Sequence, residues 1–170
     1  MDAAALRAQQ APHKELYKSE PGAALITLRA QGSVDDAKIS CKVETGRAIA
    51  EAGLHPATGG SGAELCSGDM LLEALVACAG VTLQAVATAL AIPLRGGTVK
   101  AEGDLDFRGT LGVSKEAPVG FRTVRLSFEL DTDATEEQRA TLLKLTERYC
   151  VFAQTIRNPT PVDVTITRSA

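Results

Sequence analysis

One apolar run dominates this chain: Met70-Leu-Leu-Glu-Ala-Leu-Val-Ala-Cys-Ala-Gly-Val-Thr-Leu83, continuing to Ile92. It is long enough to cross a bilayer, which takes about 20 residues. However, Glu73 and Gln84 interrupt it, and no aromatic belt lies at its ends. We therefore predict a core helix rather than a membrane span, and no membrane partner.

This helix is apolar on nearly every side, so it has to be buried on nearly every side. A single small sheet cannot surround it. We therefore expect a homodimer in which the central helices of two chains cover each other. Ser67 or Asp69 is the expected N-cap, and Pro93 is expected to end the helix.

Length and composition indicate one globular domain. The chain has 170 residues, a net charge of −3 and no tryptophan, and its lysines and arginines are scattered. These features argue against a nucleic-acid partner. The N-terminus lacks the basic and apolar regions of a secretory signal, and the four cysteines lack the close spacing of a secreted disulfide framework. We expect a cytoplasmic protein.

Alternating short stretches predict strands before and after the central helix. They cover residues 15–19, 24–30, 37–44 and 46–52, then 98–108, 119–131 and a closing strand over 161–167. A helix capped by Thr135 is expected up to Tyr149, with its apolar face at Leu142, Leu143 and Leu145, followed by a short helix over 150–156. This order predicts an α+β fold with antiparallel sheets, with residues 1–13 as an N-terminal tail or frayed helix and 14–170 as a single domain.

The four cysteines lie in different contexts. Cys41 falls in a strand pattern, where a free cysteine is usually a small core residue. Cys66 precedes the central helix in a polar loop. Cys78 lies inside the apolar helix, where burial would raise the pKa of its thiol and no group within one turn would stabilise a thiolate. The Cys150 thiol is expected to be activated more readily, because Arg148 is close in sequence and the amides at the start of a new helix favour thiolate.

Other chemistries find less support. There is no metal-binding spacing of Cys and His, and His13 and His55 fall in expected loops. A hydrolase that uses Cys78 with His55 remains an alternative. The Gly59-Gly-Ser-Gly62 run lacks the lysine of a phosphate-binding loop, so we interpret it as a flexible connection, and we expect no cofactor.

Four motifs in order resemble the OsmC/Ohr family of osmotically inducible and organic hydroperoxide resistance proteins. They are His55-Pro-Ala-Thr-Gly-Gly-Ser-Gly, Asp69-Met-Leu-Leu-Glu-Ala-Leu-Val-Ala-Cys, a strand ending at Gly109, and Glu147-Arg-Tyr-Cys. The resemblance covers about residues 36–168. The cysteine contexts are specific, whereas the glycine loop alone is weak.

The resemblance implies an OsmC-like fold, with antiparallel sheets wrapped around the central helices of an intertwined homodimer and active sites at the subunit interface. It also implies a thiol peroxidase that reduces organic hydroperoxides. Cys78 would attack the peroxide and become a sulfenic acid, and Cys150 would then form a disulfide with it. An external dithiol or a lipoylated protein would reduce that disulfide.

The chain departs from the family pattern in three places. Cys150 is followed by valine where the motif usually reads Cys-Pro. Asp69 takes the place of a family glutamate, nine residues before Cys78 and on the opposite side of an ideal helix. The activating arginine has no motif match, although Arg29 and Arg47 lie in the right region. Two alternatives follow: a stress or small-molecule-binding protein that kept the fold without efficient peroxidase chemistry, and Cys66 as a competing resolving thiol.

Overall fold

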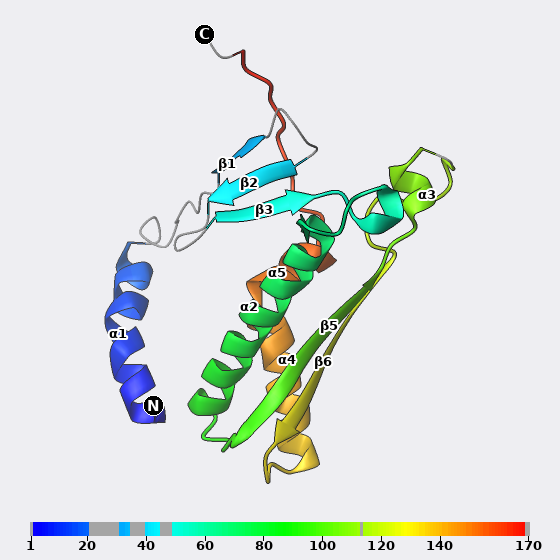
Figure 1. The fold of residues 1–170 in the computed structure, drawn as a ribbon. Coiled ribbons are helices and arrows are strands. Elements are labelled where there is room, and N and C mark those ends of the chain that lie inside the picture. The colour runs from blue at the N-terminus through cyan, green and yellow to red at the C-terminus, as the bar shows by residue number, and fades with distance from the viewer. Residues whose placement is uncertain (1, 21–30, 35–39, 45–48, 113, 169–170) are drawn as a thin grey trace.

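The computed structural model describes residues 2–20, 31–34, 40–44, 49–112 and 114–168 (Figure 1). Its elements in chain order are α1 (Ala3–Ser19), β1 (Gln31–Val34), β2 (Ser40–Glu44), β3 (Ile49–Gly53), a 3-10 turn (Pro56–Thr58), β4 (Leu65–Cys66), α2 (Ser67–Ala89), β5 (Gly96–Asp104), α3 (Phe107–Thr110), β6 (Thr123–Asp131), α4 (Glu136–Tyr149) and α5 (Val151–Arg157). The chain therefore has the mixed helix and strand content that its sequence predicts.

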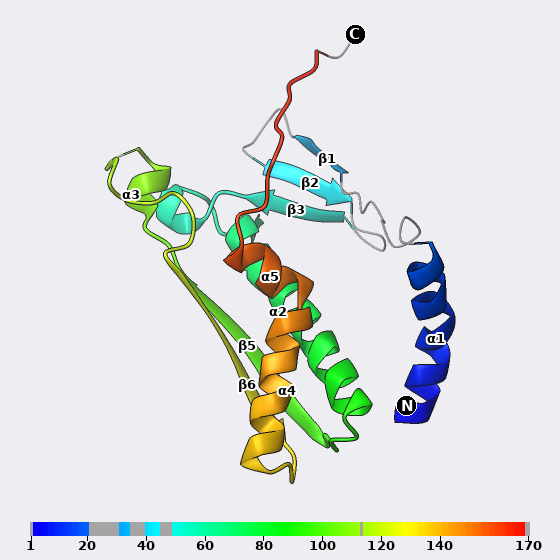
Figure 2. The ribbon, with the colours of Figure 1, turned by 180° about the vertical axis from the view of Figure 1, so that it is seen from behind.

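Helix α2 is the axis of the molecule. The hairpin β5–β6 runs along one side of it and helices α4 and α5 lie along another, as both views show (Figures 1 and 2). The second sheet, in the order β1-β2-β3-β4, lies at the N-terminal end of α2. Its pairings are antiparallel except for the short parallel contact between β3 and β4.

The hairpin buries one face against α2 because its side chains alternate. Strands β5 and β6 pair antiparallel over their whole length, from Gly96 opposite Asp131 to Asp104 opposite Thr123. Since successive side chains point to opposite faces of a strand, one face is apolar and packs inward. That face contributes Val99, Ala101, Val124, Leu126 and Phe128.

Two clusters of buried side chains form the core along α2. The first, near the C-terminal end of α2, consists of Leu83, Val86, Ala87, Ile92, Ala134 and Leu142. The second contains Leu75, Ala79 and Cys150, with Cys78 packed against it. On α4 the buried stripe is Leu142, Thr146 and Cys150, at helical spacing. Leu143, expected on this face, is instead 45 % exposed.

The predicted ends of α4 are confirmed, and those of α2 are wrong. Thr135 caps α4 through a capping box with Gln138, and the helix ends at Tyr149. Helix α2 already begins at Ser67, and its N-cap is Cys66, which makes no side-chain capping bond. It ends before Pro93 is reached, because Ala91 adopts a left-handed φ of 55° and the Ile92 amide turns back to the Ala87 carbonyl.

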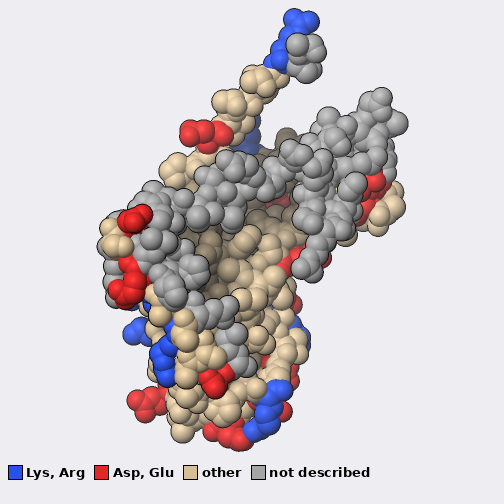
Figure 3. Space-filling view, turned by 90° about the vertical axis from the view of Figure 1, so that its left-hand side faces the viewer, with Lys and Arg blue, Asp and Glu red and all other residues tan. Residues whose placement is uncertain are grey.

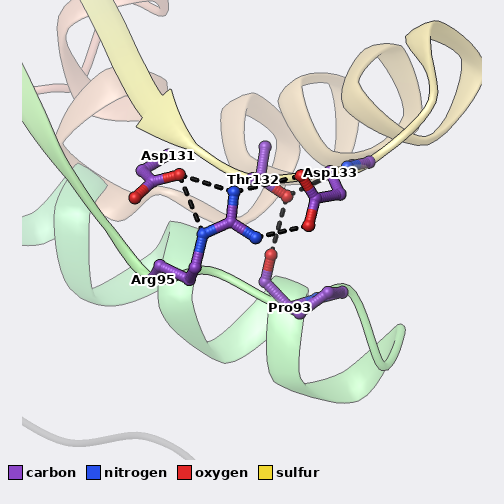
Figure 4. Close-up of polar contacts among 6 residues, drawn as sticks. Pro93, Arg95, Asp131, Thr132 and Asp133 are labelled. Carbon is purple, nitrogen blue, oxygen red and sulfur yellow. Dashed lines mark hydrogen bonds and ion pairs between the residues drawn. The ribbon is translucent and has the colours of Figure 1, made fainter.

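A polar clamp then ties the start of the hairpin to its end (Figure 4). The guanidinium of Arg95 donates to both Asp131 and Asp133, with an Nη2–Oδ1 distance of 2.7 Å to Asp131. The Thr132 hydroxyl donates to the Pro93 carbonyl at 2.7 Å. The two aspartates raise the pKa of Arg95 above its usual value, first through the hydrogen bond to Asp133. They fix the direction in which β5 leaves α2.

Several expected strands differ from the structure. Helix α1 covers residues 15–19, so the strand expected there is wrong, and it also includes most of the expected tail. Residues 24–30 lie outside the described residues. Strand β5 ends at Asp104, and the Asp106 side chain caps the short helix α3 in place of further strand. Residues 161–167 form no strand, so the expected closing strand is wrong. Their apolar side chains are exposed, at 79 % for Val162, 84 % for Val164 and 98 % for Ile166.

One side of α2 also remains exposed. By length and composition Ser67–Ala89 could cross a membrane. Only 22 % of its most apolar 18-residue stretch is buried within the single chain. Val81 is 70 % exposed there and borders a cavity with Val76, Ala77 and Gly80. Seen from the α1 side, the described surface is largely uncharged, with charged side chains mainly at its margins (Figure 3).

Candidate active site

The fold brings Cys78 and Cys150 together. Their sulfur atoms are 3.5 Å apart, although the residues are separated by 72 positions in the sequence. Cys78 comes from the middle of α2 and is half-buried, whereas Cys150 lies between α4 and α5 and is 0 % exposed. The two thiols are therefore in contact, and the one on α2 is the more accessible.

Cys150 also joins two helices. Its amide donates to the Thr146 carbonyl at 2.9 Å and so completes α4, while its own carbonyl accepts from the Gln154 amide at 3.0 Å and so starts α5. Its sulfur caps α5, since the Ala153 amide donates to it at 3.5 Å. These bonds fix the position of the sulfur relative to both helices.

The environment of Cys78 favours its thiolate. Burial raises the pKa of the Cys78 thiol, but hydrogen bonds from the Phe152 amide, the Cys150 thiol and the Val151 amide lower it further than burial raises it. The Thr82 hydroxyl contributes least, and its proton goes to the Cys78 carbonyl at 2.8 Å. The net pKa is below the usual value for cysteine.

Cys150 has the opposite character. Burial raises the pKa of the Cys150 thiol, and its hydrogen bond to Cys78 raises it further, against the lowering effect of the Ala153 amide. The pair therefore consists of a thiolate-favouring sulfur that accepts a hydrogen bond and a protonated thiol that donates it. This arrangement can support nucleophilic attack by Cys78 followed by condensation with Cys150.

The other candidate residues lie apart from this pair or outside the described residues. Asp69 is in the first turn of α2, about 13 Å along the helix axis from Cys78. Arg148, expected to assist Cys150, lies over the ring of Tyr149 at 5.7 Å. Arg29 and Arg47 fall outside the described residues.

The histidine and cysteine alternatives gain structural roles. His55 caps the turn Pro56–Thr58 by accepting from the Ala57 amide, and its ring stacks on Phe107 with centroids 4.9 Å apart. Cys66 is the half-buried N-cap of α2, twelve positions before Cys78. Within the described part of the chain, no group of three acidic, histidine or cysteine side chains could hold a metal ion.

The influence of the Val151 and Phe152 amides on the pKa of Cys78 was not predicted. The helix expected to start at Cys150 was interpreted only as an influence on Cys150 itself. The signal was present, because Val151 and Phe152 both carry an N–H and both begin a helix. What the sequence did not show is that the fold places the start of this helix beside Cys78, since Cys150 lies 72 positions away from it.

Comparisons with known proteins agree with the fold. A model of the OsmC family, described as OsmC-like protein, matches residues 59–165. No curated protein is significantly similar to the chain. Among solved structures, an OsmC-like protein from Mycoplasma pneumoniae is 14 % identical with a TM-score of 0.65, over 78 % of this chain and 88 % of that one.

Two further structures are organic hydroperoxide resistance proteins. The protein from Elizabethkingia anophelis is 18 % identical with a TM-score of 0.63, over 79 % of this chain and 90 % of that one. The protein from Legionella pneumophila is 19 % identical with a TM-score of 0.61, over 79 % and 91 %. At these identities the likeness establishes the fold alone.

Proposed function

The chain belongs to the OsmC-like family, and we propose that it is a thiol peroxidase that reduces organic hydroperoxides. The observation that carries the proposal is the 3.5 Å contact between Cys78 and Cys150, in which Cys78 is the accessible, hydrogen-bond-accepting sulfur. Two structurally similar proteins are organic hydroperoxide resistance proteins, which supports the substrate class.

The proposed reaction has three steps. The Cys78 thiolate attacks the terminal peroxide oxygen, the O–O bond breaks, and the alkoxide that leaves takes up a proton to become an alcohol. Cys78 is then a sulfenic acid, oxidised by the two electrons that the peroxide gained. The Cys150 sulfur attacks Cys78, water leaves, and a disulfide forms. An external dithiol, free or carried on a lipoylated protein, reduces the disulfide by exchange and is itself oxidised.

The difference in accessibility supports the proposed roles of the two cysteines. A peroxide can approach the half-buried Cys78, whereas Cys150 is fully buried. Apolar side chains around the pair, among them Leu75, Val99 and Leu126, would bury the alkyl part of an organic peroxide. Asp69 remains a proposed member of the site. It would have to act from the N-terminal end of α2, or from the second subunit of a dimer.

Turnover and mass spectrometry test this function. Purified protein with cumene hydroperoxide and dithiothreitol should turn over, Cys78→Ser should abolish turnover, and Cys66→Ser should leave it unchanged. One equivalent of peroxide should produce a Cys78–Cys150 disulfide in the wild type. Two free thiols after this treatment would reject the peroxidase and favour a protein that kept the fold without the chemistry.

We also propose that the protein is a homodimer. The support is the exposed apolar side of α2, together with the exposed, alternating Val162, Val164 and Ile166. Such surfaces are unusual in monomers. Light scattering should give twice the chain mass for the wild type. Val81→Lys should give monomers, because it places a charge on the exposed apolar side of α2. It should not disturb the single chain, in which Val81 is exposed. An unchanged dimer mass would exclude this face as the interface.

A further inference from the structure

We propose that the hydroxyl of Thr146 is a further group of the active site, which donates to the Cys150 sulfur whenever that sulfur carries negative charge. The inference rests on the proposed function and deepens it, because it names a donor for the step in which Cys150 attacks Cys78 and for the step in which Cys150 leaves again. In the reduced protein Cys150 is a thiol that donates to Cys78, so it makes no such demand on the hydroxyl.

Thr146 is a buried polar side chain without a partner. It lies on α4, in the core stripe that also contains Leu142 and Cys150, and it is 1 % exposed. Its hydroxyl has no hydrogen-bond partner among the described residues. A buried hydroxyl without a hydrogen bond costs free energy, and such groups are rare in native proteins. Its presence beside a pair of cysteines therefore calls for an explanation from the chemistry of that pair.

Other threonines show what this hydroxyl could have done. A helical threonine can donate to the carbonyl four residues before it. Three described threonines do so, at 2.8, 2.8 and 2.9 Å, in the pairs Thr82–Cys78, Thr88–Gln84 and Thr155–Val151. The corresponding acceptor for Thr146 is the carbonyl of Leu142, and this bond does not form. The hydroxyl therefore remains available for another acceptor in the core.

The nearest change of charge occurs one helical turn away. The Cys150 amide donates to the Thr146 carbonyl at 2.9 Å, so the turn that joins the two residues is intact. Both side chains are buried, and side chains four positions apart lie on the same face of a helix, with Cβ atoms about 5–6 Å apart. Rotation about the Cα–Cβ bond of Thr146 can bring its oxygen within hydrogen-bonding distance of the Cys150 sulfur.

Cys150 needs this donor only during the reaction. In the reduced protein its sulfur accepts the Ala153 amide at 3.5 Å and its proton is directed at Cys78. When Cys150 attacks the sulfenic acid, the S–S bond forms, the S–O bond breaks, and the thiol proton leaves with hydroxide as water. When a dithiol attacks Cys78, the S–S bond breaks, and Cys150 leaves with the electron pair before it takes up a proton. A hydroxyl donor stabilises the charged sulfur in both steps more than it stabilises the neutral thiol.

Two substitutions separate the hydroxyl of Thr146 from its shape. Thr146→Val deletes the hydroxyl and keeps the branched side chain, whereas Thr146→Ser keeps the hydroxyl and deletes a methyl group. Thr146→Val removes an unpaired polar atom, so it should not weaken the fold. Both variants are made in a background with Cys41→Ala and Cys66→Ser, in which Cys78 and Cys150 are the remaining thiols.

The test is the reaction with the aromatic disulfide dithiobis(nitrobenzoate), which needs no peroxide. Cys78 attacks the reagent and releases one thionitrobenzoate, and Cys150 then attacks the mixed disulfide on Cys78 and releases a second. The absorbance of the released thiolate reports both phases. Thr146→Val should leave the rate of the first phase unchanged and slow the second phase roughly tenfold. Thr146→Ser should keep both rates.

Three results would overturn the inference. One is a second phase that is as fast in Thr146→Val as in the background protein. Another is a second phase that Thr146→Val and Thr146→Ser slow equally, because packing would then account for the effect. A third is the release of fewer than two thionitrobenzoates by the background protein itself. Two phases with the expected rates, but no turnover of cumene hydroperoxide by the wild type, would reject the peroxidase and retain Thr146 as the donor to Cys150 in disulfide exchange.

Discussion

Oxidation should stabilise this protein by a predictable amount. The Cys78 and Cys150 sulfurs are 3.5 Å apart and need to approach by roughly 1.5 Å to reach the length of a disulfide bond. Side-chain rotation can supply most of this movement, so we expect little strain. The bond closes a loop of 72 positions, for which the loss of chain entropy in the unfolded state gives about 4 kcal/mol as an upper value.

Urea unfolding measures this gain. Wild-type protein treated with one equivalent of cumene hydroperoxide should unfold at higher urea than the same protein kept reduced, at equal protomer concentration. Cys150→Ser is the control and should show no gain on oxidation. Oxidised wild type that unfolds at the same or lower urea than the reduced form would refute the expected unstrained disulfide between the two cysteines.

Three further predictions concern stability and pH. Leu142→Ala should lower the free energy of unfolding by about 2–5 kcal/mol, because Leu142 is 1 % exposed. Leu143→Ala should lower it clearly less, because Leu143 is 45 % exposed. Equal losses for the two variants in chemical denaturation would contradict the described core. Thr146→Val should raise the free energy of unfolding by about 1 kcal/mol, since the buried Thr146 hydroxyl has no hydrogen-bond partner among the described residues; a loss would show that it has one. The hydrogen bond from Arg108 lowers the pKa of Asp106 to about 2, so this interaction stabilises the fold above the usual carboxyl pKa of about 3.9 and is lost as the pH falls towards 2. Asp106→Asn should therefore lower the melting temperature at pH 7 more than at pH 2, and equal differences at both pH values would reject it.

Local signals account for the parts of the fold that the sequence predicted well. The alternation in β6 and the Thr135 cap of α4 are properties of neighbouring residues, so they can be read without the rest of the chain. The helix ends of α2 were predicted less well. Ala91 ends its last turn in a left-handed conformation that usually requires glycine, so no sequence signal marked the position.

The two cysteines of the candidate site could be named from the sequence, but neither their contact nor the reason for a thiolate could be. The two cysteine contexts pointed to Cys78 and Cys150, yet the residues around Cys78 on α2 gave no reason for a thiolate. That reason comes from α5, whose orientation depends on how α4 packs against α2 over a long sequence separation. Asp69 looked relevant by motif alone, and the helix carries it away from the sulfur pair.

The position of Cys150 as the joint between α4 and α5 links the redox state to the backbone. In the reduced protein its sulfur accepts the Ala153 amide, whereas formation of a disulfide would draw that sulfur towards Cys78. Each cycle of oxidation and reduction of the two cysteines should therefore loosen and restore the first turn of α5, from which residues 158–168 extend. Amide hydrogen exchange at Ala153 would then report the oxidation state directly, and the C-terminal segment would respond to it.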